Sequence, residues 1–206
     1  ETSIQVVGHG LEEQKQRGKR GEGQRIGLHI HAFYPDILRQ ILIRFTRCVR
    51  SPVDIFITTA SGEKAAQIRR LLRQDFSHLC VRKLLICENR GRDVWPWLQM
   101  APLLADYDFA GHLHTKKSPT ATARFSNLWR EELLDCLLGR FAQVRSAFAQ
   151  APQLGIVIPD IPSAYGFPPF PYCYDSDGIM KKLLPEVWKR LGCRRQVNFS
   201  SMRMLV

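Results

Sequence analysis

The chain has 206 residues, of which 45% are hydrophobic and 24% charged, a composition typical of a globular protein with one core. It contains no apolar run of the about 18 residues that a membrane-spanning helix needs, and we expect no signal peptide. The net charge of +11 favours polyanions, anionic membrane surfaces or phosphorylated ligands as partners, unless it only keeps the chain soluble.

The six cysteines show neither the CxxC spacing nor the Cys/His pairing of a zinc site. Three of them, Cys80, Cys87 and Cys136, fall within predicted helices and strands. We therefore expect reduced, mostly buried thiols, as in a cytosolic protein.

Hydrophobic periodicity predicts an alternation of strands and helices after a flexible basic tail over residues 1–25. In chain order we expect a strand at 26–33, a helix at 34–45, a strand at 53–59, a helix at 61–73, a strand at 80–87, a helix at 94–105, a strand at 109–114, helices at 126–138 and 140–150, and a fifth strand at 154–158. This order predicts an α/β fold of three layers, a mostly parallel sheet with helices on both faces.

The tail and the last part of the chain differ from this pattern. We expect an α/β domain over 26–160, and after it a region over 161–206. That region begins with a loop rich in proline and aromatic residues at 161–174 and contains a short amphipathic helix at 181–191.

Two polar strings follow predicted strands, ENRGRD at 88–93 and HLHTKKS at 112–118. Ligands bind beyond the carboxyl ends of the strands in an open parallel sheet. We expect the two strand ends to lie side by side and to form a pocket for a phosphate or diphosphate.

In the first string, Gly91 permits a tight turn or a close approach to a ligand. Arg90 and Arg92 can each make forked contacts with phosphate oxygens. Asp93 could hold one arginine or bind a sugar hydroxyl. The alternative is a plain turn closed by an Arg–Asp pair.

The second string places His112 and His114 on the same side of a strand, and His29 and His31 alternate in the same way on the first strand. A metal site is one interpretation. We do not expect a metal, because the sequence puts no carboxylate or cysteine beside these histidines and Lys116 would repel a cation. A polar wall for a sugar, or a proton-shuttling histidine, fits better.

Lys116 and Lys117 are compact charges suited to a diphosphate, although Lys117 could equally be a solvated turn residue. Trp129 and Arg130 open the long helix beyond this loop. Trp129 is either a core anchor or a platform for a sugar.

Six segments in order resemble the rhamnan synthesis protein F family: HIHAFYPDIL, DIFITT, ENRGRDVWPWL, YDFAGHLHTKKS, LWREELLDCLLG and PQLGIVIPD. The resemblance runs from about residue 28 to 202. It implies a glycosyltransferase of bacterial cell-surface polysaccharide assembly, such as lipopolysaccharide or cell-wall glycans, and some members are rhamnosyltransferases.

A more distant resemblance links the chain to nucleotide-diphospho-sugar transferases, whose fold it would share. These have an N-x-G string after the third strand, matched here by Asn89, Arg90 and Gly91. They have a metal-binding D-x-D string after the fourth, where this chain has His114, Thr115, Lys116 and Lys117. The resemblance implies that cations replace the metal-binding carboxylates, so that fixed charges stabilise the leaving diphosphate without a metal or other cofactor.

The expected site follows from the two polar strings together with these resemblances. We expect the substrate-binding residues to be His29, His31, Asn89, Arg90, Gly91, Arg92, Thr115, Lys116, Lys117, Trp129 and Arg130. An inverting transfer needs a base for the acceptor hydroxyl, and the candidates are Asp93, His114 and Asp160.

One departure from the family concerns the end of the chain. Where the family has a Phe-x-Gly-Ser-Met-Phe-Trp-like string, this chain has Phe199, Ser200, Ser201, Met202 and Arg203. We therefore expect residues 161–206 to form an incomplete acceptor-side region, and this form of the enzyme could be inactive.

The leading hypothesis is a cytoplasmic glycosyltransferase, peripheral at the inner membrane face. It would move rhamnose from a donor such as dTDP-rhamnose to a glycan or lipid-linked acceptor. The alternative is a non-catalytic glycan- or nucleotide-binding module derived from such an enzyme. A specific nucleic-acid partner is not expected, because the aromatic residues do not interleave with the basic ones.

Overall fold

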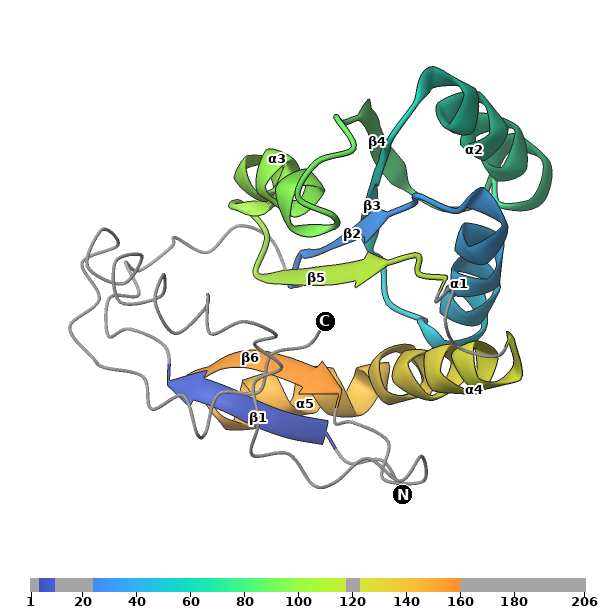
Figure 1. Ribbon diagram of the computed structural model, residues 1–206. Coiled ribbons are helices and arrows are strands. Elements are labelled where there is room, and N and C mark those ends of the chain that lie inside the picture. Colours follow the sequence, from blue (N-terminus) through green and yellow to red (C-terminus); the bar gives the residue numbers. More distant parts are fainter. Residues whose placement is uncertain (1–3, 10–23, 118–122, 160–206) are drawn as a thin grey trace, which may run out of the picture. The chain divides into compact units, whose positions relative to one another are not determined.

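The computed structural model describes residues 4–9, 24–117 and 123–159, with side chains described for 24–117 and 126–159. The chain divides into two units, Glu1–Asp160 and Ile161–Val206, and the described residues all belong to the first. Figure 1 shows the described residues in colour. Asp160, the expected loop at 161–174 and the expected helix at 181–191 lie outside the described residues.

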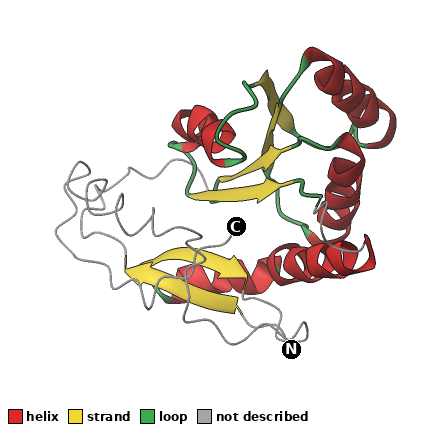
Figure 2. Ribbon diagram, in the orientation of Figure 1, coloured by secondary structure: helices red, strands yellow, loops and turns green. Residues whose placement is uncertain are grey.

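The centre of the first unit is a parallel sheet of four strands (Figure 2). The strands are β2 (Ile26–His31), β3 (Asp54–Thr59), β4 (Val81–Ile86) and β5 (Phe109–His114), in the order β4-β3-β2-β5. The connections carry α1 (Pro35–Cys48), α2 (Gly62–Asp75) and α3 (Val94–Leu104). The predicted parallel α/β fold is confirmed.

Alternate residues of β3 show how the helices are divided between the faces. Ile55 and Ile57 belong to the main core, which the apolar stripe of α1 and Ile68 of α2 also form. Phe56, between them, packs with Met100 and Leu104 of α3. Side chains alternate across a strand, so α1 and α2 cover one face and α3 covers the other.

Local signals set the helix starts. Pro35 stands at the first position of α1, where its missing N–H costs nothing. The Ser61 hydroxyl caps α2 by accepting a hydrogen bond from the Lys64 N–H at 3.3 Å. Both helices then bury one stripe, as their periodicity predicts.

Two sequence expectations about the remaining strands were wrong. Residues 4–9, expected within a flexible tail, form β1 (Ile4–His9), and the rest of that tail up to residue 23 lies outside the described residues. The strand at 154–158 is β6 (Leu154–Pro159), which pairs antiparallel with β1 in a separate sheet and does not extend the parallel one. Ile156 in the middle of this strand is 51% exposed. Periodicity identifies a strand without identifying its partner.

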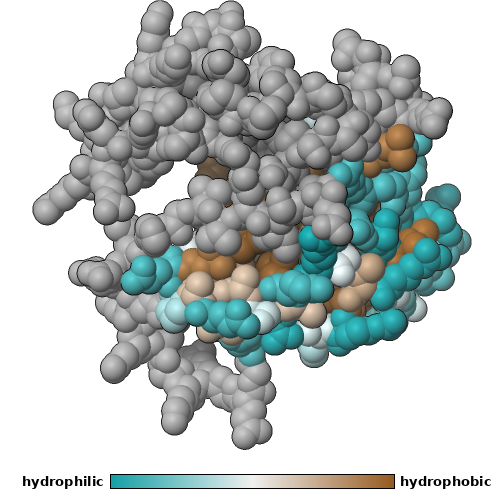
Figure 3. All heavy atoms as spheres, turned by 90° about the horizontal axis from the view of Figure 1, so that it is seen from below, coloured by the Kyte–Doolittle hydropathy of each residue, from teal (hydrophilic) through white to brown (hydrophobic). Residues whose placement is uncertain are grey.

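The helical segment before β6 is α4 (Ala123–Leu134), the π-helical turn η1 (Asp135–Gly139) and α5 (Phe141–Gln150). Arg44 of α1 joins it to the main fold by contacts with Glu131 at 2.6 Å and Asp135 at 3.3 Å. The space-filling view in Figure 3 shows one face of the molecule. Hydrophilic residues cover the outer part of its coloured surface, and hydrophobic residues lie between them. Of the helices in the described ranges, none is long and apolar enough to cross a membrane.

Candidate functional site

The strand order has a reversal between β2 and β5. From β2 the chain moves outward through β3 to β4, and then returns so that β5 lies on the other side of β2. Open α/β sheets bind their ligands at such a switch point, outside the carboxyl ends of the strands. The register there pairs His29 with His112 and His31 with His114.

The paired histidines lie on the α3 face of the sheet and form a chain of polar contacts with Thr58. The Nδ1 atoms of His29 and His112 lie 2.9 Å apart, and His29 Nε2 lies 2.8 Å from Thr58 Oγ1. The same hydroxyl lies 2.9 Å from His31 Nδ1. His29 and Thr58 are fully buried, so this series of polar contacts leads from the interior to the half-buried His112.

Trp97 of α3 packs against the two histidines of these polar contacts, His29 and His112. Its ring centroid lies 5.7 Å from that of His29 and 5.1 Å from that of His112. The two histidine rings stack on each other at 4.9 Å. The packing holds both imidazoles in one orientation.

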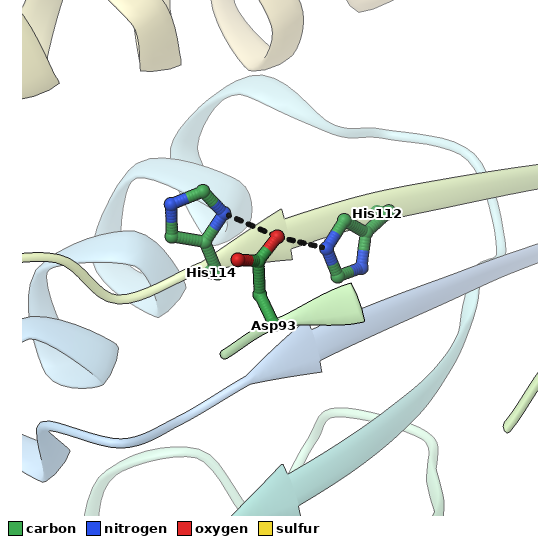
Figure 4. A group of neighbouring side chains, drawn as sticks. All are labelled: Asp93, His112 and His114. Carbon is green, nitrogen blue, oxygen red and sulfur yellow. Dashed lines mark hydrogen bonds and ion pairs between the residues drawn. The ribbon is translucent and has the colours of Figure 1, made fainter. Parts of the chain in front are cut away.

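Asp93 completes the cluster from the segment between β4 and α3. It is the N-cap residue of α3, a position where aspartate usually accepts hydrogen bonds from the helix N–H groups. Within the described structure its carboxylate makes no such bond. Its Oδ2 instead faces the rings of β5, 3.4 Å from His112 Nε2 and 3.5 Å from His114 Nδ1 (Figure 4).

Burial and neighbouring charges set the protonation of this cluster. Burial, with the nearby His112, lowers the pKa of His29 to about 3, and burial lowers that of His31 to about 4 although Asp93 opposes it. Burial likewise lowers the pKa of His114. The hydrogen bond with His112 holds the pKa of Asp93 well below its usual range. At neutral pH the site therefore combines a carboxylate with uncharged imidazoles from His29, His31 and His114.

The two cation-rich strand ends do not lie side by side as expected, because β3 and β2 separate β4 from β5. The sequence could not show this, since strand order depends on which side of β2 the last strand joins. The segment after β4 nevertheless runs back to β5, where Asp93 meets His112 and His114.

The expected anion-binding side chains are exposed, as a ligand site requires; they are Asn89, Arg90, Arg92, Lys116 and Lys117. Lys117 already has a partner, since its Nζ lies 2.7 Å from Asp36 Oδ2 at the start of α1. Burial alone would raise the pKa of Asp36, but Lys117 outweighs it and lowers that pKa.

The turn between β4 and α3 has left-handed backbone at two successive residues. Gly91 has φ of 68° and Arg92 has φ of 53°. A Cβ on Gly91 would lie 2.8 Å from the Cβ of Trp95, so glycine is required there for conformation and for space. Arg92 is strained, which is common where a backbone serves a site.

Thr115 and Arg130 were expected to bind substrate, but their described contacts lie within the fold. The buried Thr115 hydroxyl donates to the His31 carbonyl at 3.2 Å and accepts from the Tyr34 N–H at 2.9 Å. Arg130 donates to the Lys116 carbonyl at 3.4 Å and so supports the loop after β5. Trp129 is half-buried on α4.

Sequence reasoning missed the parts of the cluster that come from separate elements. Trp97 received no role, and the contacts of Thr58 with His29 and His31 were not predicted, although alternation already put the histidines of the first strand on one face. One of the two reasons for expecting no metal was also wrong, because Asp93 is a carboxylate beside His112 and His114. One ligand atom from each of these three residues lies within 4.8 Å of the others.

Comparison with known proteins gives one family. The model of the family described as "Rhamnan synthesis protein F" matches residues 3–206. Two proteins, each called "Uncharacterized protein WxcX", come from Xanthomonas campestris pv. campestris strains B100 and ATCC 33913, and both are 33% identical to this chain over 135 residues. That match covers 64% of this chain but only 18% of each relative. No solved structure matches the chain significantly.

Proposed function

The chain belongs to the rhamnan synthesis protein F family, which implies a part in rhamnan or related polysaccharide synthesis, and from this premise we propose that it binds the sugar donor of a glycosyltransferase. The donor is a nucleotide-diphospho-sugar, and the transferred sugar is rhamnose, with dTDP-rhamnose as the first compound to test. The acceptor is a glycan or a lipid-linked glycan.

One observation carries the proposal. The polar cluster of Asp93, His112 and His114 lies at the β2–β5 switch point, where open α/β sheets bind ligands. A carboxylate and imidazoles are groups that hydrogen-bond sugar hydroxyls. All three side chains are partly exposed to solvent, where a ligand can reach them. A cluster that only stabilised the fold would have no need of this exposure.

The donor diphosphate binds the exposed cations of the two segments around this cluster. Arg90 and Arg92 precede Asp93, and Lys116 follows His114 by two residues. Negative charge grows on the diphosphate as the glycosidic bond breaks, and fixed cations stabilise it. Each charge-assisted hydrogen bond contributes about 1.5–3 kcal/mol.

The transfer also needs a base to take the proton of the acceptor hydroxyl. Asp93 is a poor choice, since its depressed pKa makes the carboxylate a weak base. His114 and Asp160 are the other two candidates, and Asp160 lies outside the described residues.

The net charge of +11 supports a place at an anionic membrane surface, and we propose a peripheral position at the inner face of the cytoplasmic membrane. Vesicles with anionic lipid should retain the chain at low salt and release it at high salt, whereas neutral vesicles should not retain it. Equal retention on both kinds of vesicle would argue against this placement.

A thermal-shift titration with dTDP-rhamnose tests donor binding. At a donor concentration of about 100 times Kd, binding adds about 2.7 kcal/mol to the unfolding free energy. For a domain of this size that raises Tm by about 5–10 °C. Lys116→Ala should reduce the shift to less than half, while Arg69→Ala, which removes an exposed cation from α2, should leave it intact. Equal shifts in the two variants would contradict the assignment.

Turnover separates the enzyme from the alternative, a non-catalytic binding module. The chain matches only 18% of the length of each curated relative, so the binding-module alternative needs its own test. Release of dTDP in the presence of a polysaccharide acceptor supports the enzyme. Saturable donor binding without release supports the module.

A further inference from the structure

We propose that Asp93, His112 and His114 bind a divalent transition-metal ion, with Zn²⁺ as the best fit, and leave at least one coordination position open. The ligand atoms are Asp93 Oδ2, His112 Nε2 and His114 Nδ1. This inference rests on the geometry of the same cluster that carries the proposed donor site, but metal binding can be tested without any sugar transfer.

The two distances from Asp93 Oδ2 suit a shared ion better than a strong charge-assisted hydrogen bond, and the three ligand atoms all lie within 4.8 Å of one another. A charge-assisted N–H···O bond to a carboxylate is about 2.7–2.9 Å long. Asp93 Oδ2 lies 3.4 Å from His112 Nε2 and 3.5 Å from His114 Nδ1, so both contacts exceed that length. Ligand atoms arranged tetrahedrally at about 2.1 Å from an ion lie about 3.4 Å apart.

The donor set and its exposure also suit such an ion. Two imidazoles and one carboxylate are a common ligand set for zinc, whose catalytic sites keep a fourth position for water or substrate. The three side chains are 27%, 32% and 29% exposed for His112, His114 and Asp93, so an ion can enter from solvent. The Asp93 carboxylate is free to coordinate because it does not cap α3.

The buried contacts behind the cluster supply the support that metal-binding histidines need. A ligating histidine usually donates its other ring N–H to a fixed partner. His112 can bind an ion through Nε2 while its Nδ1–H donates to His29 Nδ1, 2.9 Å away. His29 Nε2–H then donates to Thr58 Oγ1 at 2.8 Å, and the Thr58 hydroxyl donates to His31 Nδ1 at 2.9 Å.

Without an ion, the same contacts favour hydrogen bonds donated in the opposite direction. His31 Nδ1–H then donates to Thr58, the Thr58 hydroxyl donates to His29, and His29 Nδ1–H donates to His112 Nδ1. That leaves His112 Nε2–H pointing to the Asp93 carboxylate. Binding of the ion therefore reverses every hydrogen bond in this series of histidine and threonine contacts, and it changes the tautomer of three histidines.

An ion at this cluster would also change which group can act as the base of the sugar transfer. An ion held by Asp93 and His114 occupies the two described candidates for the base. Asp160 then becomes the remaining candidate, and a diphosphate oxygen or water takes the open position of the ion.

Metal binding to the 206-residue chain is measured by equilibrium dialysis with ZnCl₂ and by the visible absorption of Co²⁺. We expect one ion per chain, with a Co²⁺ spectrum typical of tetrahedral nitrogen and oxygen ligands. Asp93→Asn and His114→Gln should each weaken binding by at least about 10-fold. His78→Ala, a histidine substitution at an exposed position outside the cluster, should leave binding unchanged.

Thr58→Val tests the supporting hydrogen bonds separately, with an expected loss of about 10-fold to 100-fold in Zn²⁺ affinity. Nitrogen-15 NMR of the histidine rings should show His29 change from the Nδ1–H to the Nε2–H tautomer when Zn²⁺ is added. Failure to bind Zn²⁺ or Co²⁺, a thiolate-to-cobalt absorption band, or equal affinity in the Asp93→Asn, His114→Gln and His78→Ala variants would overturn the proposal.

Discussion

Replacing Thr58 by valine tests whether the buried histidines depend on its hydroxyl. Thr58 and His29 are fully buried and His31 is 6% exposed. The hydroxyl lies 2.8 Å from His29 Nε2 and 2.9 Å from His31 Nδ1, and valine keeps the shape of the side chain while removing both contacts. A buried polar group without a partner costs about 1–3 kcal/mol. For two such groups, allowing for partial relaxation, we expect the variant to lose about 2–4 kcal/mol of unfolding free energy.

Urea unfolding at pH 7 measures this loss, and Thr46→Val provides the matched control. Thr46 Oγ1 also contacts a histidine, His78 Nε2 at 3.5 Å, but this contact is exposed to solvent. The control should lie within about 0.5 kcal/mol of the unchanged chain. Equal stability of the two variants would refute the reasoning, because it would mean that the histidines satisfy their ring nitrogens without Thr58.

Three further predictions concern other parts of the fold. Gly91→Ala forces an alanine to a φ of 68° and should lower the unfolding free energy by about 1–2 kcal/mol, which urea unfolding would detect; an unchanged midpoint would contradict it. Asp54→Ala removes the acceptor of the Tyr107 hydroxyl at 2.7 Å and should cost about 1–2 kcal/mol at pH 7. Burial alone would raise the pKa of Asp54, but hydrogen bonds outweigh it and lower that pKa, so the carboxylate stabilises the fold above about pH 4 and the loss should shrink as the pH falls through the lowered pKa. A loss that grew in acid would contradict this sign. Lys117→Ala breaks an ion pair whose side chains are 48% and 60% exposed, so stability should change by no more than about 1 kcal/mol, while NMR titration should show the pKa of Asp36 return upward. An Asp36 pKa that did not move would rule out Lys117 as its cause.

The parallel sheet and its helices could be predicted because their signals are local. The apolar stripe of α1, the Ser61 cap of α2 and the β-branched run of β3 each determine their own segment. The partner of β6 could not be predicted, because that choice depends on Ile4–His9, a short segment without a pattern of its own.

The candidate site was predicted in its residues but not in its arrangement. The alternation of HIH and HLH put the histidines on common faces, and the switch-point rule directed attention to the strand ends. The contact of Asp93 with His112 and His114 depends on the path of the segment between β4 and α3 across the sheet. That path depends on the order of the strands, which no local pattern encodes.

The site's most direct test is NMR of histidine-labelled chain titrated with dTDP-rhamnose. We predict that the ring signals of His112 and His114 shift with the same saturation curve as donor binding, while those of the exposed His78 stay in place. Saturable binding that leaves the signals of His112 and His114 unmoved would contradict a donor site at the β2–β5 edge.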